Sequence, residues 1–179
     1  MKSRRSNLSV PGHMAKMHLK ARDSAVDIVM FDLEDSVPVD QKEAAREQVI
    51  QSLLSLDWRN KTVTVRCNAV DTPFAYKDFM NIVENAGQML DAVVVPKVNH
   101  PGDIHFVHRL LEGIEMNKSR LNRIGIEASI ETAAGLENVS YTAKSSNRLI
   151  SLVFGIADYS TSIGAKLVSL SGHGEAEAG

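Results

Sequence analysis

The sequence predicts an α/β fold, a TIM-type (βα)8 barrel of which this chain supplies only about the first six βα units. Short β-branched runs alternate with longer amphipathic stretches, a pattern typical of parallel strands joined by helices. The repeat takes about 30 residues, close to what one βα unit of a barrel consumes. No linker or low-complexity tract interrupts the pattern, so we expect residues 1–179 to form one incomplete barrel domain.

The predicted strands are short runs rich in β-branched and other apolar residues. They cover residues 8–11, 26–32, 62–67, 92–97, 124–130 and 150–155. A closed barrel of this type needs eight strands, whereas this sequence shows six. We therefore expect either that two strands are missing from this stretch or that another chain completes the sheet, because open sheet edges favour association.

The predicted helices lie between the strands and begin or end at residues with matching conformational preferences. They are residues 41–56 with Asp40 as the N-cap, a stretch opened by Thr72-Pro73 and ended by Gly87, a stretch opened by Pro101, and residues 135–143. An open doubly wound sheet is the competing architecture. The glycine-rich fingerprint of its dinucleotide-binding version follows none of the strands.

The composition excludes several classes of protein. A net charge of −2 gives no reason to expect nucleic acid or an anionic membrane as a partner. The basic start is not followed by an apolar stretch of signal-peptide length, and no uncharged run approaches the roughly 20 residues of a membrane span. Cys67 is the only cysteine, which excludes an intramolecular disulfide. We expect a cytoplasmic protein.

Polar side chains stand where the predicted strands end, which is where barrel enzymes carry their chemistry. They are Asp32, Glu34 and Asp35 after the second strand, Arg66 and Asn68 after the third, Lys97 after the fourth, Glu131 after the fifth, and Asp158 after the sixth. Side chains alternate along a strand, so Glu127 and Glu131 share one face. Two inward carboxylates need partners, which we expect to be Arg66, Lys97 or a cation.

Glu131 and Asp158, on neighbouring strand ends, are the predicted ligands of a divalent metal. Mg²⁺ prefers oxygen ligands and usually takes one or two carboxylates, keeping water or substrate oxygens elsewhere. The histidines form no ligand set, since His105 and His108 lie on a predicted surface helix. The alternative is an internal salt-bridge network that only joins the layers of the barrel, although buried ion pairs without function are rarely favourable.

Several strings of the sequence occur together, in the same order, in one family. They are RRSNLSVPG, KARDSAVDIVMFDLEDSV, KEAAR, VTVRCNAVDTP, DAVVVPKV, IEASIETAAGLENV and SLVFGIADYSTSIGA. Over almost all of its 179 residues the chain thus resembles the malyl-CoA lyase and citrate lyase β-subunit family of the HpcH/HpaI aldolase superfamily. The phrase DTPF and the trailing SGHGEAEAG favour the malyl-CoA lyase side.

The resemblance implies a TIM-type barrel assembled as a trimer or hexamer, and it implies roles for particular residues. Glu131 and Asp158 would bind Mg²⁺, or in some members Mn²⁺. Arg66 would contact the oxo acid and the developing enolate, and the backbone of Ala157 and Asp158 would lie against the acid's carboxylate. Lys20 stands where a family member uses a basic residue for substrate or CoA.

The chain departs from the family pattern at one visible place. Met14 occupies a second basic position soon after the Pro-Gly turn, which removes part of the expected CoA contact. The family's later pieces, including a catalytic aspartate that reaches in from a neighbouring subunit, would fall beyond Gly179.

We therefore expect a Mg²⁺-dependent carbon–carbon lyase. It would cleave or form a 3-hydroxyacyl-CoA, such as a malyl-, β-methylmalyl-, citramalyl- or citryl-thioester, giving acetyl- or propionyl-CoA and an α-oxo acid such as glyoxylate. Arg66, bidentate and permanently cationic, suits the charge that develops on the enolate oxygen. Glu34 and Asp35 would order metal-bound water or pair with Arg66 or Lys97, and Lys97 would neutralise Glu127.

Other interpretations stay open at this point. One is a malyl-CoA thioesterase or a metal-dependent aldolase acting on free oxo acids. An interpretation from another class is a truncated, non-catalytic subunit that only binds partner barrels.

Overall fold

The computed structural model describes residues 3–119 and 123–166. Within them, strands and helices alternate as the sequence predicts. The strands are β1 (Asn7–Pro11), β2 (Ile28–Asp32), β3 (Thr62–Arg66), β4 (Ala92–Val95), β5 (Gly125–Ile130) and β6 (Leu149–Phe154). The helices are α1 (Ala15–Asp23), α2 (Lys42–Ser55), α3 (Ala75–Ala86), α4 (Pro101–Asn117), α5 (Ala133–Glu137), α6 (Val139–Thr142) and α7 (Ile156–Ser162), with short 3₁₀ turns η1 (Val39–Gln41) and η2 (Gly87–Met89).

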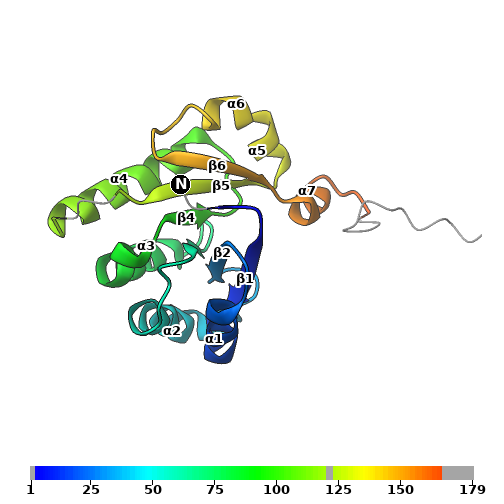
Figure 1. The fold of residues 1–179 in the computed structure, drawn as a ribbon. Helices are drawn as coiled ribbons and strands as arrows, with labels where there is room; N and C mark the ends of the chain where they lie inside the picture. The colour runs from blue at the N-terminus through cyan, green and yellow to red at the C-terminus, as the bar shows by residue number, and fades with distance from the viewer. Residues whose placement is uncertain (1–2, 120–122, 167–179) are drawn as a thin grey trace, which may run out of the picture.

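All strand pairings in the described residues are parallel, and the strands follow one another in the order β1-β2-β3-β4-β5-β6. This sequential order is that of a barrel wall. In a doubly wound sheet the strands are also parallel, but their order across the sheet reverses partway. Figure 1 shows the curved sheet with helices α1 to α4 packed around its outer side. The expected α/β barrel architecture is confirmed, with β1 and β6 as its open edges.

Sequence signals at helix starts were partly right. Pro101 opens α4 as predicted, and the side chains of His100 and Asp103 form a capping box there. Asp40 is not the N-cap of α2, because it lies inside η1 and Gln41 takes that position without a side-chain cap. Residues 135–143 form no single helix, since the backbone breaks between α5 and α6 at Asn138.

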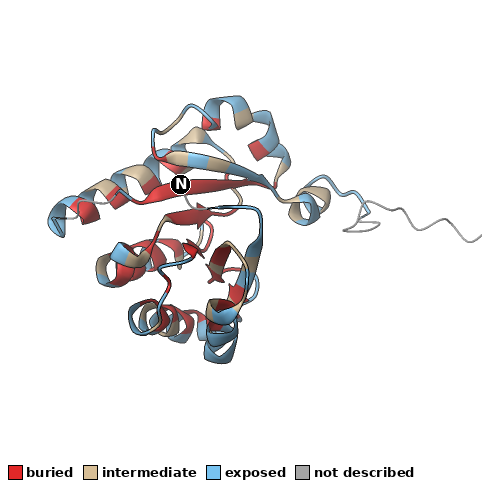
Figure 2. Cartoon of the chain, in the orientation of Figure 1, coloured by how far each residue is buried: buried red, intermediate tan, exposed pale blue. Residues whose placement is uncertain are grey.

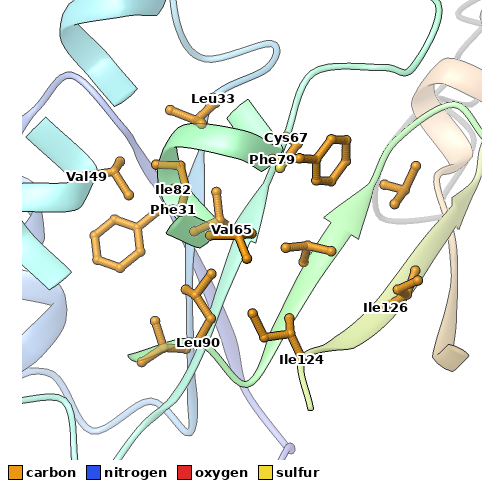
Figure 3. Packing of buried hydrophobic residues seen from close by; sticks show 14 of the residues in the cluster. Phe31, Leu33, Val49, Val65, Cys67, Phe79, Ile82, Leu90, Ile124 and Ile126 are labelled. Atoms are coloured by element: carbon orange, nitrogen blue, oxygen red, sulfur yellow. The ribbon is translucent and has the colours of Figure 1, made fainter. Parts of the chain in front are cut away.

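The hydrophobic core lies between the sheet and the outer helices. Side chains of β2 and β3 such as Phe31 and Val65 meet Phe79 and Ile82 of α3, as Figure 3 shows. Cys67 joins this core, so it faces the helices. The core fixes the outer side of the strands and leaves their carboxyl ends to carry polar groups.

Strand β6 differs from its neighbours in burial. Every residue of β5 is buried, whereas Ile150 and Phe154 of β6 are 54% and 53% exposed (Figure 2). In the described part of the chain, β6 pairs with β5 along one edge only. Of the helices in residues 3–119 and 123–166, none is both long enough and apolar enough to cross a membrane.

Candidate functional site

Arg66 and Asp32 form the base of a polar cluster at the carboxyl ends of the strands. They are direct partners in the register of β2 and β3. Nε and Nη2 of Arg66 donate to Oδ1 and Oδ2 of Asp32, both at 2.8 Å. Burial alone would raise the pKa of Asp32, but the hydrogen bonds and charge of Arg66 outweigh it and hold that pKa below its usual value. Asp32 therefore stays ionised and fixes the plane of the guanidinium.

Asp32 also shapes the loop that follows β2. Its Oδ1 accepts from the backbone N–H of Glu34 at 2.9 Å, and its Oδ2 accepts from that of Ser36 at 3.1 Å. Sequence reasoning assigned Asp32 no role. The signal was present, because a fully buried acid ending an apolar strand requires partners.

Glu34 and Asp35 face two cations, which is one of the two alternatives expected for them. Nη1 of Arg66 lies 3.2 Å from Oε2 of Glu34 and 3.4 Å from Oδ2 of Asp35. Nζ of Lys97 donates to Oε1 of Glu34 and lies 3.4 Å from Oδ1 of Asp35. Glu34 is buried, whereas the Asp35 side chain is 54% exposed, so Glu34 is the acid held inside the cluster.

Burial and the neighbouring cations act on Glu34 in opposite directions. Burial raises the pKa of Glu34 to about 7, even though Lys97 and Arg66 act in the opposite direction. Its Oε2 is buried and has no hydrogen-bond partner in the described structure, only the ion pair with Arg66. An acid with a pKa near neutrality and an unused oxygen is suited to receive a polar ligand or a proton.

Lys97 links this group to Glu131. Its backbone adopts the left-handed conformation, with φ of 49°, which is uncommon for a residue with a side chain. In that conformation its N–H donates to Oε1 of Glu131 at 2.7 Å while its ammonium turns toward Glu34. Burial is the main cause that raises the pKa of Glu131, opposed by the Lys97 N–H and reinforced by the charge of Asp158.

Gly155 provides the space that Glu131 occupies. A Cβ at this glycine would lie 2.4 Å from Oε2 of Glu131 and 2.7 Å from its Cβ. Its φ of −95° is one that any residue adopts, so the requirement for glycine here is steric. The start of α7 and the metal-ligand candidate of β5 are thus packed directly together.

The sequence suggested that Asp158 lies at the end of a strand, but the structure places it in the first turn of α7. β6 ends four residues earlier, at Phe154. The helix still brings Asp158 to the cluster, where its Oδ2 is 3.8 Å from Nζ of Lys97. Ala157 precedes it in the same turn and is exposed.

Two predicted site residues lie apart from this cluster. Lys20 is exposed in the last turn of α1, the end of the helix that leads back to the amino ends of the strands. The side chain of Asn68 turns to Asp78 of α3, to which its Nδ2 donates at 2.6 Å. Asn68 therefore supports the loop after β3, and a CoA contact by Lys20 stays a prediction.

Glu127 has a partner that sequence reasoning missed. We expected Arg66, Lys97 or a cation to neutralise it, but Arg4, just before β1, donates to its Oε1. Lys97 contacts other acids, so the predicted pairing of Lys97 with Glu127 is wrong. A partner 123 residues away leaves no signature in local sequence patterns.

The donor set fits a magnesium ion. Glu131 and Asp158 both contact Lys97 and offer carboxylate oxygens, the ligand type that Mg²⁺ prefers. Across residues 3–119 and 123–166, no group of three or more His, Cys, Asp and Glu side chains gathers as a complete metal site. Two protein carboxylates with water or substrate oxygens completing the shell match the usual magnesium arrangement, and exclude a zinc-type cage from this region.

The fold and the cluster define a barrel protein of βα units with a charged site at the carboxyl ends of its strands. Residues 5–174 match the HpcH/HpaI aldolase/citrate lyase family, and the chain belongs to that family. It is 39% identical over 168 residues to the L-malyl-CoA/beta-methylmalyl-CoA lyase of Cereibacter sphaeroides, covering 94% of this chain and 53% of that protein. It is 33% identical over 159 residues to the citrate lyase subunit beta of Leuconostoc mesenteroides subsp. cremoris, covering 88% of this chain and 52% of that protein.

A solved structure agrees on the fold. The CitE protein from Mycobacterium tuberculosis, in complex with magnesium, acetoacetate and coenzyme A, matches with a TM-score of 0.73 and 23% identity. The match covers 95% of this chain and 55% of that one. This chain therefore spans about half the length of the relatives it matches.

Proposed function

We propose that this chain carries the metal-binding half of a Mg²⁺-dependent carbon–carbon lyase acting on a 3-hydroxyacyl-CoA. The observation that carries the proposal is that Glu131 and Asp158 both border Lys97, one at its N–H and the other at its ammonium, beside an Arg66 fixed by Asp32. The names of the relatives support malyl-CoA and β-methylmalyl-CoA as the substrate class. The products would be acetyl- or propionyl-CoA and an α-oxo acid such as glyoxylate.

The charges of the cluster match what this cleavage needs. When bound, Mg²⁺ would supply Lewis acidity and a template for the carboxylate and carbonyl oxygens of the oxo acid. Glu131 and Asp158 would hold it, and the backbone of Ala157 and Asp158 would lie against the acid's carboxylate. These roles follow the donor chemistry and the family resemblance.

Arg66 would stabilise the negative charge that develops on the enolate oxygen of the CoA thioester. Asp32 holds two of the guanidinium nitrogens, and Nη1 faces Glu34 and Asp35. A guanidinium held in this way needs little reorganisation when charge develops beside it. Lys97 would keep the acidic loop after β2 electrically balanced while substrate binds.

The direct test is product analysis with malyl-CoA and Mg²⁺ in the full-length protein, comparing the wild type with Glu131→Ala. We expect release of acetyl-CoA and glyoxylate by the wild type, and loss of both turnover and Mg²⁺ binding by calorimetry in the variant. Glu137→Ala is the matched control, because Glu137 is exposed on α5. Near-normal turnover in Glu131→Ala would contradict the proposal.

The same assay separates the rival functions. Free CoA with intact malate would identify a thioesterase, and cleavage of free hydroxy acids would identify an aldolase. Stabilisation by CoA thioesters and Mg²⁺ without turnover would identify a non-catalytic binding subunit. Assembly as a trimer or hexamer and a cytoplasmic location stay predictions, which sedimentation and cell fractionation would test.

A further inference from the structure

A buried lysine holds the loop that carries Glu34. Nζ of Lys42, in the first turn of α2, donates to the backbone carbonyls of Leu33 and Glu34, each at 2.6 Å. Lys42 is only 7% exposed. The proposed lyase chemistry gives this side chain no role.

The loop after β2 is bound by two buried side chains of opposite charge, Asp32 and Lys42. Asp32 accepts from the N–H of Glu34 and of Ser36, whereas Lys42 donates to the carbonyls of Leu33 and Glu34. Both backbone polar groups of Glu34 are thereby engaged by buried charged side chains. Such charge-assisted hydrogen bonds are roughly twice as strong as neutral ones.

Burial disfavours the charged form of Lys42, so its ammonium needs compensating partners. Burial lowers the pKa of Lys42, and the nearby charges of Asp78, Asp32 and Glu34 act against that shift. The ring of Phe74 lies 5.9 Å from Nζ, close enough for a cation–π contact. A buried ammonium needs hydrogen-bond partners, and here those partners are carbonyls of the loop that faces Arg66 and Lys97.

We propose that Lys42 is a positioning residue that fixes the loop of residues 32–36 and so aims the Glu34 carboxylate at Lys97 and Arg66. Its effect on the site is indirect, since its own ammonium contacts backbone carbonyls. The consequence for turnover rests on the proposed lyase function. The consequence for the loop does not, so the two can be tested separately.

Lys61 offers a matched control. It is 8% exposed, and its Nζ also donates to two backbone carbonyls, those of Ser24 and Val26. These carbonyls precede β2, at the opposite end of that strand from Asp32 and Glu34. Lys61→Met therefore removes a similar buried cation and leaves the proposed site untouched.

The experiment compares Lys42→Met, Lys42→Arg and Lys61→Met. Methionine keeps an unbranched chain, and arginine restores donors to both carbonyls. In Lys42→Met, we expect amide hydrogen exchange at Glu34 and Ser36 to rise about tenfold or more over wild type. The value of kcat should fall about tenfold or more with KM for the acyl-CoA little changed, because small misplacements of catalytic geometry are expensive.

In Lys42→Arg, amide exchange in the loop and kcat should both return most of the way to wild-type values. In Lys61→Met, neither should change. Exchange in the loop that is equal in Lys42→Met and Lys61→Met would overturn the proposal. So would faster loop exchange with unchanged kcat. A wild-type protein without lyase turnover would contradict the proposed function, and the exchange measurement would still decide whether Lys42 fixes the loop.

Discussion

The guanidinium of Arg66 and the carboxylate of Asp32 meet fork to fork across two adjacent strands, through two hydrogen bonds of 2.8 Å. This bidentate geometry fixes the plane of the cation as well as its charge. Nη1 is left to face Glu34 and Asp35. A mutation can therefore keep the positive charge at position 66 and remove only the planar geometry of the guanidinium.

Arg66→Lys keeps the positive charge but loses the fork. A single ammonium lacks the planar fork that binds both oxygens of Asp32 while Nη1 faces Glu34 and Asp35, so we expect lyase turnover to fall by about 10²–10³. Circular dichroism should show the fold intact. Arg59→Lys is the control, because Arg59 pairs with Asp57 on the exposed surface. Near-normal turnover in Arg66→Lys would be incompatible with the proposed role.

Gly155→Ala should damage the metal site through packing alone. The new methyl group would collide with Glu131, and we expect about 1–3 kcal/mol of lost stability together with weaker Mg²⁺ binding. Gly113→Ala, inside α4, places its methyl group where no other atom lies within 4 Å, and should instead raise stability by about 0.5–1 kcal/mol. Denaturant unfolding and Mg²⁺ titration measure both. Equal behaviour of the two variants would refute the steric argument.

The ion pair of Arg148 and Glu115 should matter far more for stability than its surface counterpart. Arg148 donates to both oxygens of Glu115, at 2.8 and 2.6 Å, and joins α4 to the start of β6. Arg148→Met leaves Glu115 buried, so we expect a loss of about 3–5 kcal/mol. Arg109→Met breaks the exposed pair with Glu112 on the same helix and should cost far less, because solvent screens that pair. Urea denaturation compares them, and similar losses would contradict the prediction.

His18 should make stability depend on pH. Its Nδ1 lies 2.8 Å from Oγ of Ser52 and its Nε2 lies 3.0 Å from the carbonyl of Pro11, an arrangement that suits the neutral ring. Burial lowers the pKa of His18 below its ordinary value of 6.5, although the hydrogen bond to the Pro11 carbonyl acts in the opposite direction. The unfolded chain therefore binds a proton first, and the free energy of unfolding should fall as the pH drops below 6.5.

The measurement is the free energy of unfolding from pH 8 to pH 5 in wild type and His18→Gln (about the range over which histidine titrates). The difference between the two curves isolates His18 from Glu34, whose raised pKa acts with the opposite sign. A difference that does not change with pH would show that His18 is not the titrating group.

Much of the fold followed from the sequence because parallel βα units repeat locally. The β-branched runs and helix signals such as Pro101 lie close to the elements they predict. Helix α1 was missed because its buried face is made of His18 and Ala21, which carry no apolar periodicity. Helix α7 was missed because the apolar run of β6 continues into it and hides the boundary.

The sequence predicts which polar residues lie at the strand ends, but not which of them contact one another. Register brings Asp32 to Arg66, yet only the left-handed backbone of Lys97 explains how one residue contacts both Glu131 and Glu34. The supporting role of Lys42 was equally hidden, since its partners are backbone carbonyls. Sequence patterns report side-chain types, and these contacts depend on loop conformation.

The contact between Arg4 and Glu127 also bears on the order in which the chain folds. It joins residues 123 positions apart, so the segment before β1 cannot reach its charged partner until β5 exists. Closing so long a loop carries an entropic cost and slows folding. We expect docking of this segment to be a late step of folding. Before it, Glu127 lacks the ion pair with Arg4. Loss of the first few residues should then speed unfolding of the sheet and leave its folding rate little changed.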